Sequence, residues 1–300
     1  MYFYRCYATN SAGTGWSEAA WFLPGVAFVN VDAGGADNGS TWSNAYRNLS
    51  NALARVPVSF ELWVADGMYT CASPNASFAI GTNTLYGGFA GGETNRNQRD
   101  WSNNVALLSG NLGGGIFATN VVLKSLAGTA TLDGLTIAGG RATANAANRT
   151  GRGAGIYLDA GNLYLQNCII SNNQSADLAG AVLLNEANVT HQFVNCSFVL
   201  NLTYLAGANG GAVYLNSGHL RLYDCLFRTN VCENNGGAVY RYGSPEKPFL
   251  ESYNCSFLNN IASNAGGAVA YFASANIGIT IFSNCTFAGN RSLTTTGGGA

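Results

Sequence analysis

The sequence predicts an all-β protein, a right-handed parallel β-helix with an N-terminal capping region that contains one helix. From about residue 130 the chain repeats with a period near 30 residues, a period typical of solenoids and related repeat folds. Each repeat contains three short apolar stretches without helical spacing, which predicts three strands per turn. Glycine is abundant, at 39 of 300 residues, and charged residues make up only 10%. This composition favours turn-rich β structure.

Two linked motifs carry the repeat. The pattern [Asn/Asp]-Cys-x-[Phe/Ile]-x-x-Asn occurs five times, and its cysteines are spaced 28, 29, 30 and 30 residues apart. A run of small residues followed by Val or Ile, as in GGAVYL, lies between successive copies. The motif cysteines are Cys168, Cys196, Cys225, Cys255 and Cys285, and the residues before them are Asn167, Asn195, Asp224, Asn254 and Asn284.

Backbone geometry assigns a place to each motif position. Asn and Asp tolerate the left-handed conformation that a sharp corner needs, so the first position is predicted at a bend. The Asn side chains of stacked repeats are expected to form a hydrogen-bonded ladder. Because side chains along a strand alternate in direction, the cysteine and the residue two positions later are both predicted to point into the core. The paired glycines begin the next strand, where a tight turn leaves no room for a side chain.

The cysteines are interpreted as packing residues. Single cysteines on successive turns form a line, whereas a metal centre needs several ligands around one point. Parallel, in-register cysteines also suit the dihedral of a disulfide poorly. We therefore expect free, buried thiols that act as small hydrophobic residues, and no metal or cofactor. Cys6, Cys71 and Cys232 lie off the ladder, and the sequence does not pair them.

Residues 1–24 differ from the repeats. Tyr2, Tyr4 and Cys6 alternate with Phe3, Arg5 and Tyr7 as the two faces of one strand. A turn is predicted after this strand, over residues 10–13. The string YFYRCYATNSAGTGWS resembles the end of a fibronectin type III domain, which implies that residues 1–24 are the C-terminal remnant of such a domain. Because two strands cannot bury a sandwich core, we expect this segment to fray or to pack on the next domain.

Residues 26–110 are predicted to form the N-terminal cap. VAFVN and ELWVA alternate as strands, whereas TWSNAYRNLSNALARV has apolar residues at helical spacing. That stretch predicts one helix, with Thr41 or Ser43 as N-cap and Pro57 just after its end. Residues 111–300 are predicted to form the β-helix. The final GGGA begins another copy of the small-residue motif, so we expect the helix to be truncated at its C-terminal end.

The two motifs together resemble known repeats. The GGA[VI] and [ND]Cx[FI]xxN alternation is similar to the repeats of chlamydial polymorphic outer membrane proteins. Residues 28–300 as a whole resemble large bacterial extracellular β-helix proteins with a pectin-lyase-like fold. The resemblance implies a secreted or cell-surface protein, associated with the bacterial outer membrane, and it implies no particular activity.

The charge and hydropathy of the chain limit the classes of partner that we expect for it. A formal net charge of -1 gives no electrostatic basis for binding nucleic acid. No run of 18 or more apolar residues occurs, so no transmembrane segment is predicted. Extracellular glycans or surface proteins are the expected partners.

Three tyrosines form the candidate binding stripe. If the valine of GGAVY faces inward, Tyr157, Tyr214 and Tyr240 face outward on one strand line, where exposed rings could stack on sugars. In active proteins of this fold the same sheet holds the substrate groove. The favoured function is therefore a non-catalytic, adhesin-like rod that presents a long face to glycans or proteins. Besides this binding rod and the enzyme described in the next paragraph, a third alternative is a spacer that binds no partner.

The alternative to binding alone is a carbohydrate-active enzyme, either a polysaccharide lyase or a glycoside hydrolase. Asp159 and Glu186 occupy nearly equivalent places in adjacent repeats, and stacking would bring them about 5 Å apart, as in a retaining glycosidase. Both are equally explained as turn residues. His191 and His219 have no evident nucleophile or acid partner in the sequence, so we expect structural or solvated roles for them.

Overall fold

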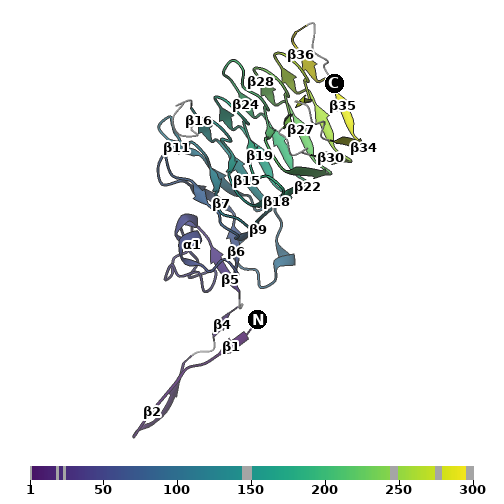
Figure 1. The fold of residues 1–300 in the computed structure, drawn as a ribbon. Helices are drawn as coiled ribbons and strands as arrows, with labels where there is room; N and C mark the ends of the chain where they lie inside the picture. The colour runs from purple at the N-terminus through teal and green to yellow at the C-terminus, as the bar shows by residue number, and fades with distance from the viewer. Residues whose placement is uncertain are drawn as a thin grey trace.

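The protein is a right-handed parallel β-helix, drawn from its computed structural model in Figure 1 as a rod of stacked coils with short hairpins at the N-terminal end. The structure describes residues 2–17, 20–22, 25–143, 151–243, 249–273 and 279–294. Among these residues no helix is long and apolar enough to cross a membrane.

Four parallel sheets form the sides of the rod. Sheet 1 contains β8 (Phe78–Ala79), β13 (Val122–Lys124), β17 (Ile156–Leu158), β21 (Val182–Leu184), β25 (Val213–Leu215), β29 (Val239–Gly243) and β33 (Val269–Ala273). Sheet 2 contains β5 (Val26–Val29), β6 (Glu61–Ala65), β9 (Thr84–Phe89), β14 (Thr129–Asp133), β18 (Asn162–Gln166), β22 (Thr190–Val194), β26 (His219–Tyr223), β30 (Leu250–Tyr253) and β34 (Thr280–Ser283).

The other two sheets complete each turn of the chain. Sheet 3 contains β7 (Gly67–Thr70), β10 (Ala106–Ser109), β15 (Leu135–Ala138), β19 (Ile169–Ser171), β23 (Ser197–Val199), β27 (Leu226–Arg228), β31 (Ser256–Leu258) and β35 (Thr286–Ala288). Sheet 4 contains β16 (Arg141–Ala142), β20 (Gln174–Ser175), β24 (Leu202–Thr203), β28 (Val231–Cys232), β32 (Ile261–Ala262) and β36 (Arg291–Ser292).

Each later coil has four strands, so the prediction of three strands per turn is wrong. The chain runs from sheet 1 through sheets 2 and 3 to sheet 4, as in β17, β18, β19 and β20, before β21 starts the next coil. Sheet 4 escaped prediction because its strands have only two residues, and some of their inward positions are polar, such as Ser175 and Thr203. Such short pieces carry no apolar periodicity.

The core is a narrow column filled by identical positions of successive coils. Phe198, Phe227, Phe257 and Phe287 stack face to face, with ring centroids 4.6, 5.0 and 4.7 Å apart. Cys168, Cys196, Cys225 and Cys255 lie beside them and are almost fully buried. The predicted inward direction of these positions is confirmed, and each coil buries its apolar side chains against its neighbours.

The predicted corner ladder is also confirmed. All five Asn or Asp residues that precede the motif cysteines have φ between 50° and 56°. Their side chains hydrogen-bond along the rod, with Asn195 donating to Asn167 at 2.7 Å and Asn284 donating to Asn254 at 2.8 Å. The ladder thus provides hydrogen bonds at the corners, where φ is positive, and joins neighbouring coils at the same position of the repeat.

A second ladder, for which the sequence suggested no role, lies inside the rod. The last residue of the motif supplies it: Asn173, Asn201, Asn230, Asn260 and Asn290. The first four are fully buried. Each of these four amides donates to the Oδ1 atom of the next, at 2.9 to 3.1 Å, and each also bonds a carbonyl of an earlier coil. Buried amides are stable only when paired in this way.

Among the described residues the N-terminal region contains one α-helix, as predicted, together with a short 3-10 helix, η1 (Arg96–Gln98). The α-helix is shorter than expected. Helix α1 (Leu49–Arg55) begins after Asn48, whose side chain accepts a hydrogen bond from the Asn51 amide. The predicted N-caps, Thr41 and Ser43, lie in turns instead. There the Thr41 hydroxyl and the Asn44 side chain bond nearby backbone amides, which competes with helix formation. Helix α1 packs against β5 and β8 at the end of the rod (Figure 1).

The sheets continue through the predicted boundary between cap and β-helix at residues 110 and 111. Strand β10 before the boundary pairs in parallel with β15 after it, and β9 pairs with β14. A short antiparallel pair, β11 (Asn111–Gly113) and β12 (Ile116–Phe117), projects from the coil at this point. The division into two domains remains a prediction.

The first residues form two small antiparallel pairs. Strands β2 (Tyr7–Asn10) and β3 (Gly13–Trp16) flank the turn predicted over residues 10–13, and β1 (Tyr2–Tyr4) pairs with β4 (Ala20–Phe22). Side chains from residue 5 to residue 17 are exposed, and the β2–β3 hairpin extends away from the rod (Figure 1). The relation of this segment to fibronectin type III domains remains a prediction.

Candidate functional site

The three tyrosines predicted to bind glycans do not lie on the surface of the protein. Tyr157, Tyr214 and Tyr240 are only 3%, 5% and 6% exposed, so the prediction that they face solvent is wrong. They do point away from the main core, but they pack under the segments that lead from sheet 4 back to sheet 1, against residues such as Leu178. Burial raises the pKa of the Tyr214 hydroxyl. The outer face of sheet 1 is therefore a second, smaller core.

The candidate catalytic carboxylates do not occupy equivalent places. Leu158 pairs with Leu184, so the residue beside Asp159 is Asn185, and Glu186 is displaced by one position. The Glu186 carboxylate accepts a hydrogen bond from the Gly161 amide at 3.2 Å. Both carboxylates are half-buried at corners between sheets 1 and 2. Glu186 thus has a turn-stabilising contact, and its catalytic pairing with Asp159 stays a prediction.

Both histidines make structural contacts, in line with the role predicted for them. His191 is fully buried, and its Nδ1 atom accepts a hydrogen bond from the Leu163 amide at 3.3 Å. His219 Nδ1 accepts from the Phe249 amide at 3.1 Å, and its ring stacks on Phe249 with centroids 4.3 Å apart. The described contacts of each ring therefore support the coil rather than a nucleophile.

The cysteines are free thiols, six of them buried. Cys196, Cys225 and Cys255 each donate a weak hydrogen bond to the carbonyl two residues earlier, at 3.3 Å. Burial raises the pKa of Cys196, and it raises that of Cys71 to about 11. Because the thiolate is the reactive form, the Cys71 and Cys196 thiols are chemically quiet at neutral pH, whereas hydrogen bonds with Cys196 and Cys255 lower the pKa of Cys225. Within the described residues no cluster of His, Cys, Asp or Glu could hold a metal ion.

A groove on the outer face of sheet 3 is the better candidate site. It has a volume of about 310 Å³, and the ends of β15, β19 and β23 form its floor. Thr136, Ile169 and Ser197 are register neighbours on that floor. The loop between β9 and β10 forms the wall, where Trp101 is 40% exposed and Val105 is 44% exposed. An aromatic wall thus faces a row of hydroxyl and aliphatic side chains.

The Trp101 wall is fixed to the rod. Gly88 in β9, with φ +95°, lets the Trp101 backbone approach so closely that a Cβ atom would lie 2.7 Å from the Trp101 nitrogen. Arg99 lies over the rings of Trp101 and Tyr86, at 5.1 and 5.0 Å from their centroids. The Asp100 carboxylate accepts bonds from the Ser102 and Asn103 amides, and side-chain hydrogen bonds lower its pKa to about 2. The wall is therefore held before any ligand arrives.

One polar edge of the groove is a run of linked side chains. Arg99 donates to Asp133 at 2.5 Å, Asn167 donates to the same carboxylate at 2.8 Å, and Asn195 donates to Asn167. The next residue of the ladder is Asp224, which has no donor to offer. The Asn195 Oδ1 atom consequently receives no hydrogen bond from any described residue. An exposed acceptor is left at the edge of the groove.

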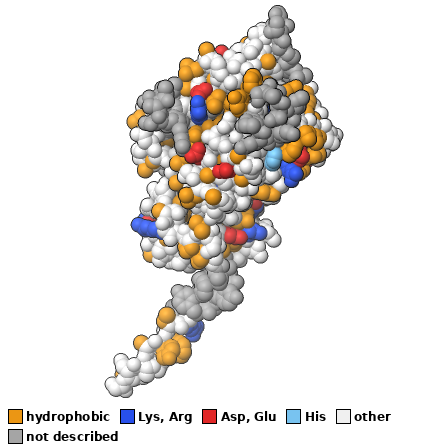
Figure 2. Space-filling model, in the orientation of Figure 1, with side chains coloured by type: hydrophobic (Ala, Val, Ile, Leu, Met, Phe, Trp, Pro, Cys, Tyr) orange, Lys and Arg blue, Asp and Glu red, His pale blue; other side chains and the backbone are white. Residues whose placement is uncertain are grey.

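The groove is uncharged. Among the described residues that line it there is no Asp, Glu, Lys, Arg or His. The carboxylates beside it are engaged, Asp133 by Arg99 and Asn167, and Asp100 by Ser102 and Asn103. Over the face drawn in Figure 2, charged side chains of both signs are few and scattered. The site therefore offers stacking and hydrogen bonding, but the groove lining contains no pair of groups for acid–base chemistry.

Comparisons with known proteins identify the architecture. No family model and no curated protein sequence matches the chain. Among solved structures, the pectin methylesterase of Aspergillus niger in a penultimately deglycosylated form has a TM-score of 0.50 at 14% identity, over 93% of this chain and 91% of that chain. The deglycosylated form of that enzyme gives 0.48 with the same identity and coverage. At this identity the likeness shows the fold, a pectin-lyase-like β-helix.

Proposed function

We propose that this chain is a non-catalytic β-helix module that binds a glycan in the groove beside Trp101. The observation that carries the proposal is a fixed, exposed tryptophan that faces an uncharged floor of hydroxyl and aliphatic side chains, with amide groups along one edge. In this proposal the module belongs to a secreted or cell-surface protein and displays the groove on the side of a rod. Placement at a bacterial outer membrane rests only on the resemblance of the repeats.

Sugar chemistry matches the groove on two counts. The C–H face of a pyranose ring is apolar and packs on an aromatic ring, such as the Trp101 indole. The ring hydroxyls need donors and acceptors, which Thr136, Ser197 and the open Asn195 oxygen supply. Pockets that join one apolar wall with a few oriented polar groups are typical of small-ligand sites.

The solved neighbour supports a second candidate, a carbohydrate-active enzyme. That neighbour is an esterase of pectin, so the fold can serve a polysaccharide as substrate. At 14% identity the likeness carries no catalytic residue across to this chain, and Asp159 and Glu186 would have to act from a corner rather than from the groove. Release of methanol, shorter chains or unsaturated ends from a bound polysaccharide would favour the enzyme.

A variant that blocks the groove beside Trp101 tests the proposed glycan binding. Ile169 is 45% exposed at the centre of the floor, so Ile169→Arg should fill the groove without disturbing the core. Leu226→Arg is the matched control, because Leu226 pairs with Ser197 in the same outward row but lies outside the groove. On an array of extracellular polysaccharides we expect binding by the unaltered chain and by Leu226→Arg, with loss in Ile169→Arg.

Two outcomes on this array would count against the proposal. Binding that persists in Ile169→Arg places the glycan elsewhere, and absence of binding by the unaltered chain removes the glycan function.

A further inference from the structure

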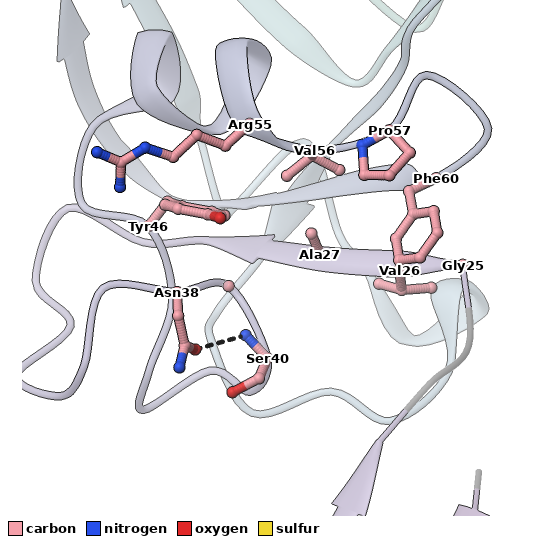
Figure 3. A pocket seen from close by; sticks show the side chains of 11 residues that line it. Gly25, Val26, Ala27, Asn38, Ser40, Tyr46, Arg55, Val56, Pro57 and Phe60 are labelled. Carbon is pink, nitrogen blue, oxygen red and sulfur yellow. Dashed lines mark hydrogen bonds between the residues drawn. The ribbon is translucent and has the colours of Figure 1, made fainter.

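A second pocket, separate from the Trp101 groove, lies in the N-terminal region of the rod. Its volume is about 560 Å³, within the range of small-molecule sites. Helix α1 and its C-terminal turn form one side, β5 forms the back, and the loop around residues 38–40 closes the other side (Figure 3). The proposed glycan function makes no use of it.

Most of the pocket surface is apolar. Val26 and Ala27 come from β5, and Val56, Pro57 and Phe60 follow helix α1. Figure 3 shows these side chains around one space, with the Phe60 ring near Val26. The loop opposite is held in shape by Asn38, whose side chain accepts a hydrogen bond from the Ser40 amide at 3.1 Å. An apolar body of moderate size fits this lining.

The hydroxyl of a largely buried tyrosine opens into the same space. Tyr46 as a whole is only 8% exposed, and no described residue bonds its Oη atom, but the Oη atom itself is accessible. In Figure 3 the Tyr46 hydroxyl is directed toward the side where Ala27 and Val56 lie. Because the hydroxyl is accessible, it can bond water, and it is placed to donate to a polar atom of a ligand that displaces that water.

The charged residue at the rim of the pocket indicates the charge of the ligand. Arg55 ends helix α1 and is the sole charged residue among the described residues that line the pocket. It forms no ion pair with any described residue, whereas nearby Arg47 pairs with Asp37 and Arg96 pairs with Glu61. An unpaired guanidinium beside an apolar pocket favours an anionic group.

We propose that this pocket binds an amphipathic anion, with an aromatic or aliphatic body and one carboxylate or sulfonate group. The body packs on Val56, Pro57 and Phe60, and the acidic group meets Arg55 at the rim. The Tyr46 hydroxyl donates to a second polar atom of the ligand. This site is independent of the Trp101 groove, and either can fail without the other.

Two dyes of similar shape and different charge test the proposal. 8-Anilinonaphthalene-1-sulfonate carries the predicted anion, and N-phenyl-1-naphthylamine is its neutral analogue. By fluorescence titration of the full chain we expect Arg55→Gln to weaken binding of the sulfonate at least about fivefold, and the neutral dye to bind unchanged. Ser40→Trp, which places a large ring over the pocket from an exposed position, should weaken both dyes.

Arg47→Gln is the matched control, since it removes an exposed arginine of the same region that does not line the pocket. It should bind both dyes as the unaltered chain does. Equal sulfonate affinity in the unaltered chain, Arg55→Gln and Ser40→Trp would overturn the proposal, because the dye would then occupy another surface. An equal loss of both dyes in Arg55→Gln would also overturn it, since Arg55 would then be a structural residue.

Discussion

Replacing Asn230 with alanine is expected to lower the free energy of unfolding by about 2 to 4 kcal/mol. Its Oδ1 atom accepts bonds from the Asn201 backbone amide and side chain, at 3.1 and 3.0 Å, and its amide donates to Asn260 and to the Phe198 carbonyl, both at 2.9 Å. Alanine leaves the Asn201 amide without this acceptor inside the rod. An orphaned buried group costs about 1–3 kcal/mol, to which the lost packing of the amide is added.

The matched control for Asn230→Ala is Asn254→Gly in the exposed corner ladder. Asn254 is solvent-exposed and has φ 56°, a conformation that glycine adopts without strain. We expect a loss below about 1 kcal/mol there, since water replaces the ladder partners. Urea unfolding followed by circular dichroism measures both midpoints. Equal shifts in the two variants would mean that the inner ladder does not bear the stability assigned to it.

His191 is expected to make the β-helix less stable in acid. Burial lowers the pKa of its imidazole from 6.5 to about 4, with smaller effects from His219 and Lys124, the other cations that act on it. The unfolded chain therefore takes up a proton near pH 6.5, but the folded chain does so only near pH 4. Stability falls as the pH drops through this window, by about 3 kcal/mol in total.

The variant that isolates this effect is His191→Gln. Glutamine keeps an acceptor for the Leu163 amide but does not titrate. Urea unfolding at pH 7.5 and at pH 4 should show a smaller difference in His191→Gln than in the unaltered chain, by about 3 kcal/mol. His219→Gln, at a half-buried position, should change the difference less. An unchanged pH dependence in His191→Gln would show that the imidazole is solvated in the folded state.

Much of the fold could be predicted because every coil requires the same residue types at the same positions of the repeat. A left-handed corner selects Asn or Asp at positions such as 195 and 224, and the narrow core selects Cys and Phe two residues apart. These demands are local, and five repetitions make them visible. Strands of two residues leave no such trace, so sheet 4 was missed. The start of helix α1 was misplaced because the Thr41 hydroxyl bonds the Asn44 amide within a turn, and the Asn44 side chain bonds the Ala36 amide in the preceding loop.

The site could not be predicted in the same way. Alternation correctly turned Tyr214 away from the main core, but a segment distant from its strand covers it, and alternation says nothing about such covering. Trp101 lies outside the repeat, in the polar string RDWSNN. A lone tryptophan among polar residues was the available signal, but its position beside Ile169 depends on how the β9–β10 loop crosses sheet 3.

The central claim is that Trp101 forms a sugar-binding wall, and calorimetry with a glycan found on the array tests it most directly. Trp101→Ala removes the wall, and Trp16→Ala removes another exposed tryptophan, 62% exposed on the N-terminal hairpin. The account predicts at least tenfold weaker binding for Trp101→Ala, equivalent to about 1.4 kcal/mol, and an unchanged affinity for Trp16→Ala. The same dissociation constant for the unaltered chain and Trp101→Ala would contradict it.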